Sequence, residues 1–212
     1  MIQRSSSRMV TGTLVAVLGM AGGMQQAQAA GATYKIVPSQ SKFTVWSKTS
    51  SPLPNLRHTR QQRTSNFSGN VAFSAPNKPS SVTMNVQADS LKTVVEHDLN
   101  TGTAARVDMV TKRDILQSDK YPTITFKGIG SNVKVGAGGA ISGTLKGNLS
   151  LHGVTRAVSV PLSGKVSGNM VNAKGQFTLK QSDYGITLIS IMGGMLAAQD
   201  PVTIDFNLVA KK

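Results

Sequence analysis

Apolar and polar residues alternate at a period of two through most of this chain of 212 residues. The final stretch is the clearest case, with four apolar positions separated by single polar ones: Val202, Ile204, Phe206 and Leu208. Because successive side chains of a strand point to opposite faces, this pattern gives each strand one apolar and one polar face. Gly, Asn, Ser and Pro mark the gaps between the alternating segments. The chain is therefore predicted to be all-β.

About eight principal strands follow from the alternation, with a weaker one over residues 166–171. Besides the final stretch, their apolar positions are Phe43 and Val45; Phe67, Val71 and Phe73; Val82, Met84 and Val86; Ile124 and Phe126; Ile141, Leu145, Leu149 and Leu151; Val158, Val160 and Leu162; and Phe177 and Leu179. Eight strands close into a barrel that can hold one small ligand, and closure leaves no exposed edge. We predict a closed antiparallel eight-stranded β-barrel. Gly143 and Gly147 share a face with Leu145, which favours strong curvature over simple weakening of that strand.

Three segments depart from the strand pattern. Residues 103–116 place apolar side chains at helical intervals, which predicts a short helix near one mouth of the barrel. Residues 50–65 are polar and have no period, so we expect a loop there. Residues 184–199 are apolar and contain Met192 and Met195. Because methionine adapts to irregular ligands and to gaps alike, this segment is either a flap that contacts a ligand or an ordinary plug of the core.

The first 29 residues have the character of an export signal. Arg4 and Arg8 precede an apolar run from Met9 to Met24, and the small-x-small sequence of residues 27–29 follows it. A transmembrane anchor is the alternative, but the run is shorter than the roughly 20 apolar residues that span a bilayer. We expect a cleaved signal peptide over residues 1–29, one domain over residues 30–212, and secretion to the periplasm. The chain has no cysteine, which excludes disulfides and a lipoprotein anchor.

The full chain has a formal net charge of +14, and removal of Arg4 and Arg8 with the predicted signal leaves +12, which is large for a domain of this size. Outside the cytoplasm, a basic surface meets anionic lipid head groups and envelope polymers more readily than nucleic acid. The sequence contains no zinc finger, no RNP aromatic pair and no recognition helix. We expect no nucleic-acid partner, and solubility alone is the alternative use of the charge.

The chain offers little for catalysis, because it has three histidines and no cysteine nucleophile. His97 lies between Glu96 and Asp98, but neighbours on one strand point to opposite faces and seldom hold a metal together. His152 precedes Gly153 in a predicted hairpin, where we expect it to stabilise the turn. We predict that the protein is not an enzyme and that it holds no cofactor or metal.

Three motifs carry a resemblance to a known family: Tyr-Pro-Thr-Ile-Thr-Phe at residues 121–126, Leu-His-Gly-Val-Thr-Arg at 151–156 and Ser-Asp-Tyr-Gly-Ile at 182–186. The chain resembles the YceI-like family of periplasmic, lipocalin-like proteins that bind polyisoprenoids or other long-chain amphiphiles. The resemblance covers essentially all of the mature chain. It departs at residues 40–41, where Gln-Ser stands in place of the family's usual His-Ser, and at Gln181, where the family commonly has arginine. It implies a lipocalin-like barrel that carries a polyisoprenoid, a quinone tail or a fatty acid derivative.

We expect the ligand's chain to lie inside the barrel, because each buried methylene contributes about 0.8 kcal/mol. The predicted ligand-binding side chains are Phe67, Phe73, Met84, Val86, Phe126, Leu145, Leu149, Phe177, Leu179, Met192, Met195 and Phe206. Head-group contacts are expected at the mouth from Arg57, His58, Arg60 or Arg63 and from Lys112 and Arg113. The alternative is an interaction module that binds anionic envelope polymers through its basic surface without an internal ligand. The sequence leaves a homodimer open.

Overall fold

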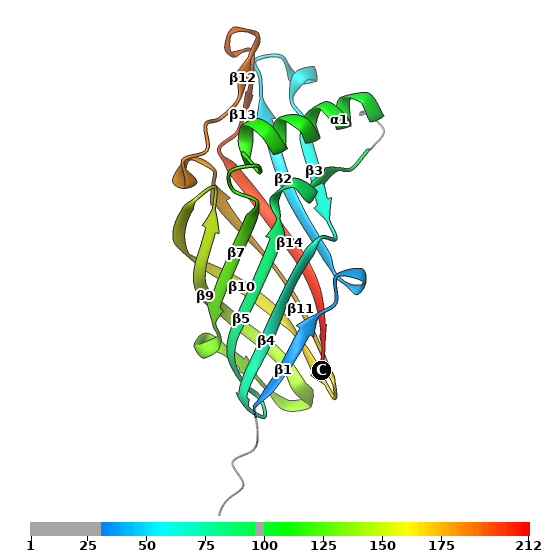
Figure 1. Cartoon of the computed structure of the whole chain (residues 1–212), viewed down its shortest axis with the longest axis vertical. Helices are drawn as coiled ribbons and strands as arrows, with labels where there is room; N and C mark the ends of the chain where they lie inside the picture. The colour runs from blue at the N-terminus through cyan, green and yellow to red at the C-terminus, as the bar shows by residue number, and fades with distance from the viewer. Residues whose placement is uncertain (1–30, 96–99) are drawn as a thin grey trace, which may run out of the picture.

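A computed structural model describes residues 31–95 and 100–212 of the chain. It is a closed antiparallel barrel of eight strands, which confirms the predicted fold class (Figure 1). In order around the barrel these are β1 (Ala32–Ile36) continued by β2 (Lys42–Ser50), then β4 (Phe67–Ala75), β5 (Lys78–Gln87), β7 (Thr123–Ile129), β9 (Ala140–Leu151), β10 (Val154–Ser167), β11 (Met170–Lys180) and β14 (Pro201–Lys211). The sheet closes because β14 pairs with β11 on one edge and with β1 and β2 on the other. The predicted export signal lies outside the described residues.

β1 and β2 together occupy the place of a single strand in the barrel wall. A short 3-10 turn, η1 (Pro38–Gln40), separates them, and both pair with β14, through Ile36 opposite Ala210 and Phe43 opposite Phe206. The hydroxyl of Ser41 holds the kink, because it donates to the carbonyl of Val37 at 2.7 Å and accepts from the amide of Val209 at 2.9 Å. The sequence pattern predicts that the first strand begins at Phe43, whereas in the structure β1 precedes the kink.

β9 is the long curved strand that the sequence predicts. Two strands pair one after the other along the same edge of β9. The short strand β8 (Val133–Val135) pairs with its start, with Gly143 opposite Val133, and β7 pairs with its later part, with Gly147 opposite Gly128. A side chain at Gly147 would place its Cβ 2.5 Å from the carbonyl oxygen of Lys127, so glycine permits the close approach of the strands. The prediction of a separate weak strand over residues 166–171 is wrong. Those residues are the end of β10, a turn at Gly168, and the start of β11.

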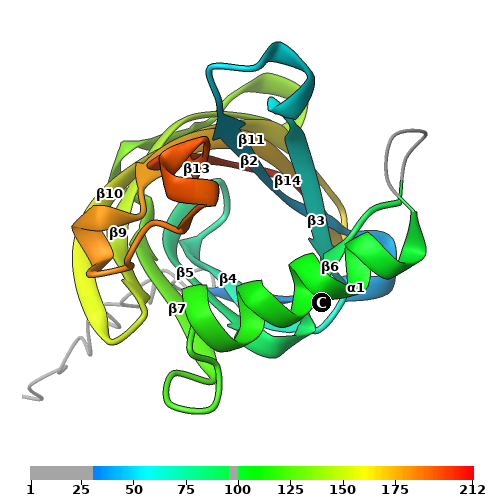
Figure 2. The same ribbon diagram turned by 90° about the horizontal axis from the view of Figure 1, so that it is seen from above.

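Most of the irregular structure lies at the upper end of the barrel in Figure 1. Helix α1 (Thr101–Val110) continues into one π-helical turn, η4 (Thr111–Ile115), and confirms the helix predicted for residues 103–116. Seen from above, α1 runs along one side of this end (Figure 2). Beside it lie β3 (Thr59–Thr64), which pairs with β2, and β6 (Lys92–Thr93), which pairs with β3. The short η3 (Ala88–Ser90) joins β5 to this region.

The segment from residue 50 to 65 is not the simple loop that its composition predicts. It contains the turn η2 (Pro54–Leu56) and all of β3. No apolar alternation marks β3, because its inward positions Arg60 and Gln62, like His58 just before it, face the opening of the barrel and not its core. The strand is therefore polar on both faces.

Residues 185–199, hereafter the flap, fold as a small hairpin on the rim. It contains β12 (Ser190–Ile191), the turn η8 (Met192–Gly194) and β13 (Leu196–Ala198), and it follows η7 (Ser182–Tyr184). β13 pairs with the end of β2, with Ala197 opposite Ser50. The flap thus extends the barrel wall upward and does not plug the interior.

The opposite end of the barrel is filled by aromatic packing. Tyr34 on β1 packs edge-on against Phe73 with ring centroids 5.4 Å apart, and both side chains are buried. The Tyr34 hydroxyl donates to the carbonyl of Gly168, in the turn between β10 and β11, at 3.4 Å. The 3-10 turns η5 (Gly130–Asn132) and η6 (Ala137–Gly139) connect β7 to β8 and β8 to β9. Within the described ranges, no helix has the length and apolar character needed to cross a membrane.

Candidate functional site: an apolar cavity with a basic rim

The barrel encloses a cavity of about 640 Å³. Its wall takes apolar side chains from every barrel strand, because the inward positions of alternating strands converge there. Nine of the predicted side chains line it: Phe73, Met84, Val86, Phe126, Leu145, Leu149, Phe177, Leu179 and Phe206. The alternation therefore directs these side chains into the cavity, and their contact with a ligand stays a prediction.

Three predicted side chains lie elsewhere. Phe67 is buried and packs against Phe43, with ring centroids 6.2 Å apart, in the core beside the cavity. Met192 and Met195 are 60% and 40% exposed at the tip of the flap. The tip turns away from the barrel, and the flap instead contributes the apolar side chains Ile186, Ile189, Ile191, Leu196 and Ala198 to the wall.

Polar lining is confined to the end of the barrel near α1. It comes from β2, from β3 and the residue before it, from α1 with η4, and from the residue after β11: Ser47, Lys48 and Thr49; His58, Arg60 and Gln62; Thr103, Arg106 and Thr111; and Gln181. Four of these side chains are basic or can become cationic, and among the described lining residues none is acidic. The cavity is therefore apolar along its depth and has a basic rim.

The six basic residues predicted at the mouth separate into two groups. His58 and Arg60 line the cavity. The other four make polar contacts outside it: Arg57 donates to the carbonyl of Ser51, Arg63 donates to the side-chain oxygen Oε1 of Gln61, and Lys112 and Arg113 pair with Asp89 and Asp114. Lys48 and Arg106 line the rim but were not predicted. Helical spacing from Thr103 to Val107 and Val110 would have placed Arg106 on the same face of the helix.

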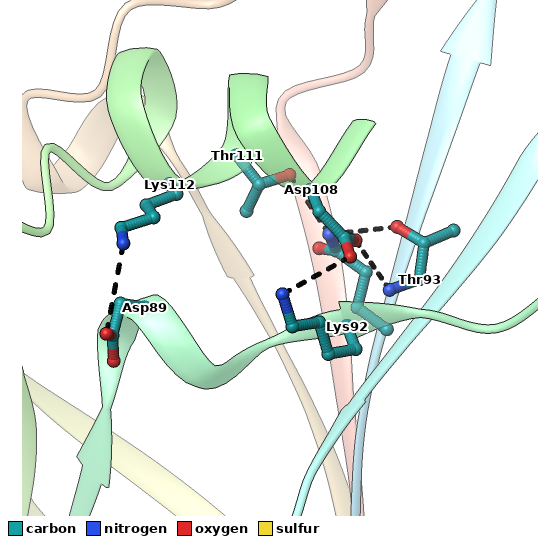
Figure 3. A network of polar contacts seen from close by, with 7 residues as sticks. Asp89, Lys92, Thr93, Asp108, Thr111 and Lys112 are labelled. Atoms are coloured by element: carbon teal, nitrogen blue, oxygen red, sulfur yellow. Dashed lines mark hydrogen bonds and ion pairs between the residues drawn. The ribbon is translucent and has the colours of Figure 1, made fainter. Parts of the chain in front are cut away.

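A polar network fixes α1 over the rim (Figure 3). The carboxylate of Asp108 accepts a hydrogen bond from the backbone amide of Thr93 at 2.7 Å and lies 3.8 Å from the ammonium of Lys92. The buried amide of Gln62 donates to the hydroxyl of Thr111 at 3.0 Å and to that of Thr93 at 3.4 Å. Buried polar groups that satisfy one another in this way hold a single arrangement. The helix is thereby tied to β3 and β6.

The polar and aromatic residues of the three motifs that carry the family resemblance meet outside the cavity. The rings of Tyr121 and His152 lie 4.7 Å apart, and the Nδ1 of His152 lies 3.2 Å from the carbonyl oxygen of Tyr184. Arg156 donates to the carbonyl of Asp183 at 3.0 Å. Burial raises the pKa of Tyr184, whose side chain is 1% exposed. This cluster anchors the start of the flap to the turn between β9 and β10.

That turn forms as predicted. His152 has a φ of 52° and Gly153 a φ of 76°, the left-handed pair that a tight two-residue hairpin requires. None of the motif residues Tyr121, His152 and Tyr184 is among the described residues that line the cavity. These three side chains therefore shape the frame of the site, whereas the apolar motif residues Ile124, Phe126, Leu151 and Ile186 line the cavity.

The base of the flap is pinned by a second set of hydrogen bonds. Gln181 donates through its side-chain amide to the carbonyl of Gln199 at 2.9 Å. Ser182 donates to both carboxylate oxygens of Asp200, through its backbone amide at 2.8 Å and its hydroxyl at 2.6 Å. These donors lower the pKa of Asp200, because they favour its charged form.

The described residues contain no group of three or more His, Cys, Asp or Glu side chains that could hold a metal. The predicted weak candidate, His97 with Glu96 and Asp98, lies outside those residues.

Comparisons with known proteins agree with this architecture. The family model described as the YceI-like domain matches residues 34–210. A UPF0312 protein of Pseudomonas paraeruginosa is 32% identical over 133 residues, which cover 59% of this chain and 63% of the relative. The chain thus spans less than two thirds of that relative's length.

Two solved structures share the fold. BcnA of Burkholderia cenocepacia has a TM-score of 0.58 and 22% identity, over 83% of this chain and 99% of that one. A domain from Saccharophagus degradans, described as polyisoprenoid-binding and implicated in plant cell wall breakdown, has a TM-score of 0.59 and 16% identity, over 84% and 97% of the two chains. At such identities the likeness concerns the fold.

Proposed function

Because this chain belongs to the YceI-like family, we propose that it is a periplasmic binding or carrier protein that sequesters a long-chain amphiphile inside its barrel. The observation that carries the proposal is the contrast between an apolar wall and a basic rim in one cavity. An amphiphile has the matching division into an apolar chain and a polar head.

The size of the cavity suits such a ligand. Its volume of about 640 Å³ lies within the range of small-molecule sites, roughly 300–1,000 Å³. Each methylene that leaves water for the wall contributes about 0.8 kcal/mol, so a chain of a dozen carbons outweighs several imperfect contacts at the head group. The Saccharophagus degradans domain of the same fold is described as polyisoprenoid-binding. We therefore favour a polyisoprenoid, a quinone tail or a fatty acid derivative.

The rim would receive the head group. Lys48 and Arg106 approach it from β2 and α1, and His58 and Arg60 approach it from the β3 side. Their positive charges and N–H donors suit a phosphate, a carboxylate or a quinone oxygen. The proposal needs no turnover chemistry, and it treats the protein as a carrier and not as an enzyme.

Export is part of the same proposal. We infer that residues 1–29 act as a cleaved signal peptide and that residues 30–212 form the mature domain. N-terminal sequencing of protein recovered from the periplasm of its host would test the cleavage point. Full-length protein in the cytoplasm would contradict it.

Native mass spectrometry tests the ligand directly. Protein purified from its host should carry an adduct that organic extraction releases as an isoprenoid or acyl lipid. Protein stripped of that lipid should rebind added prenols, quinones or fatty acids in a titration. Absence of a co-purifying lipid, together with failure of all three ligand classes to bind, would refute the carrier proposal.

The strong positive charge supports a second candidate. With a net charge of +14, the protein could act as an interaction module that binds anionic envelope polymers and leaves its cavity without a ligand. This candidate predicts salt-sensitive binding to an anionic polysaccharide and no extractable lipid. The same extraction experiment therefore separates the two candidates.

A further inference from the structure

Exposed apolar side chains gather at one end of the molecule. Among the described residues, the large hydrophobic side chains that are exposed are Leu53, Val95, Met109, Ile129, Ile191, Met192 and Met195. All except Ile129 belong to segments at the α1 end: the loop after β2, the segment before α1, α1 itself and the flap. Ile129 ends β7, whose start faces α1, and so it lies toward the other end (Figure 1). Apolar exposure concentrated in this way marks an interaction surface.

Two loops project farthest at this end. The turn η2 and the tip of the flap both extend beyond α1 in Figure 1. They lie next to each other, because β13 of the flap pairs with the end of β2 through Ala197 and Ser50. Leu53 on the first loop is 43% exposed, and Ile191 on the second is 50% exposed. We call Leu53, Ile191, Met192 and Met195 the apolar tip.

The backbone of the apolar tip is strained at Met192. Met192 has a φ of 55°, followed by Gly193 at 64° and Gly194 at 93°. A left-handed conformation is unfavourable for a residue with a Cβ, so glycine would be the less strained choice at Met192. Nothing lies within 4 Å of a Cβ built at either glycine, so the turn stands free of the rest of the molecule. Strain that exposes a methionine is typical of a functional position.

The charges at this end fit an anionic partner. No Asp or Glu occurs in the first 88 residues, and residues 185–199 contain no charged side chain. The exposed side chains of Lys48, Arg57 and Arg106 lie in the segments beside the tip. The carboxylates of Asp89, Asp108 and Asp114 are each within 4.0 Å of a lysine or arginine, which offsets their charge.

We propose that this end of the barrel docks on the surface of an anionic lipid bilayer. Apolar side chains on projecting loops suit the boundary between head groups and acyl chains, and flanking cations suit the negative surface potential. A soluble polyanion would use the cations but would leave the apolar tip in water. Docking in this orientation turns the mouth of the cavity toward the bilayer, from which an amphiphile could pass without crossing water. The docking itself goes beyond carriage of a ligand and does not depend on it.

Vesicle flotation tests the proposal with the mature protein. Phosphatidylcholine vesicles serve as the neutral surface, and vesicles that also contain phosphatidylglycerol serve as the anionic one. Wild-type protein should float with the anionic vesicles and much less with the neutral ones. The double variant Met192→Ser and Met195→Ser should partition about tenfold less, whereas Ile129→Ser, the exposed apolar residue toward the other end, should bind as wild type does.

A matched pair of charge variants tests the electrostatic part. Arg57→Gln should weaken binding to anionic vesicles about fivefold, whereas Lys165→Gln, on the far part of β10, should have little effect. Equal binding by wild type and the double methionine variant would overturn the proposal. Binding to a soluble anionic polysaccharide but not to vesicles would also overturn it, in favour of a polymer partner.

A second measurement guards against misfolded variants. The chain has no cysteine, so Met192→Cys and Ile129→Cys each create one site for a polarity-sensitive fluorophore. Anionic vesicles should shift the emission of the label at position 192 to the blue and leave the label at position 129 unchanged. The same response at both positions, or no response at position 192, would contradict insertion of the tip.

Discussion

Gly147 lies where β9 and β7 approach too closely for any side chain. A Cβ there would meet the carbonyl oxygen of Lys127 at 2.5 Å and the ring of Phe126 at 2.8 Å. Because one neighbour is backbone, relief would require the strands to separate. We expect Gly147→Ala to lower the free energy of unfolding by about 3 kcal/mol, measured by urea denaturation.

Gly168→Ala is the control for that substitution. Gly168 has a φ of 54°, but nothing lies within 4 Å of a Cβ built there. Its cost should be limited to the backbone, about 1 kcal/mol. Equal losses in the two variants would show that close packing at Gly147 is not what the glycine provides.

At the scale of single residues, the sequence predicts the side chains of the cavity wall better than those of the rim. Leu145 and Phe206 were placed correctly because a strand fixes the direction of each side chain by its parity. Met192 and Met195, predicted to bind the ligand, lie exposed at the tip of the flap and not in the cavity wall, and their contact with a ligand stays a prediction. The direction of a side chain on a turn depends on backbone angles that composition does not reveal. Arg106 was missed because helical spacing places it on one face with Thr103, Val107 and Val110 but does not say that this face lies over the opening.

The docking of α1 depends on Asp108 more than on intrinsic helix stability. Asp108→Ala would leave the amide of Thr93 without its acceptor and would remove the partner of Lys92. We expect a loss of about 1–3 kcal/mol in the free energy of unfolding and faster amide hydrogen exchange over residues 101–115. A released helix should also speed dissociation of any ligand held below the rim.

Asp114→Ala is the matched control on the same helical segment. Asp114 pairs with its exposed neighbour Arg113, and exposed pairs contribute roughly 0–1 kcal/mol. Its hydrogen exchange should match that of wild type. Equal hydrogen-exchange protection of α1 in Asp108→Ala and Asp114→Ala would show that the network in Figure 3 does not hold the helix.

The base of the flap should respond to acid through Asp200. Hydrogen bonds from Ser182 lower the pKa of Asp200 below its ordinary value of 3.8. A lowered pKa in the folded state stabilises the fold above the unfolded pKa, and this stabilisation is lost as pH falls through the folded value. The flap should therefore loosen only below about pH 4, seen as an acid-dependent shift of the Ser182 amide in NMR spectra.

Ser182→Ala and Asp200→Asn separate the causes. The first removes one donor and should raise the pKa of Asp200 toward its ordinary value. The second removes the carboxylate and should abolish the acid step. An acid step that persists in Asp200→Asn would assign the titration to another group.

Among the elements, the sequence predicts those whose pattern reflects a buried face. The helix over residues 103–116 and the alternating barrel strands were recognised for that reason. β3 was not, because its inward side chains face the opening and it carries no apolar period. β1 was not predicted from the alternation, because the turn at residues 38–40 interrupts the strand that β1 and β2 would otherwise form together.

Across the whole molecule, the recognisable motifs contribute apolar side chains to the cavity wall and a polar and aromatic cluster to the frame, but none of the polar rim. The cluster of Tyr121, His152 and Tyr184 fixes the frame outside the barrel, whereas β3, α1 and the flap shape the opening. Motif recognition therefore predicts the container reliably and says little about what enters it. Ligand selectivity should depend on the rim and on the depth of the apolar cavity.

The depth of the cavity leads to a prediction about chain length. Each added methylene should strengthen binding by about 0.8 kcal/mol, or roughly fourfold, until the chain fills the barrel, after which affinity should level off. Val160 lines the cavity and is 4% exposed, opposite Leu145 on β9. Val160→Phe should shorten the usable depth, so its affinity should level off at a shorter chain in calorimetric titrations with saturated fatty acids.

Ser159→Phe provides the control, because Ser159 is the next residue on β10 and its exposed side chain points to the opposite face. That variant should follow the wild-type dependence on chain length. The short-chain affinities of all three proteins should be similar, since a short chain can occupy the part of the barrel that Val160→Phe leaves open. A uniform loss of affinity in Val160→Phe at every length would instead indicate a disturbed wall, and an unchanged plateau would place the bound chain elsewhere.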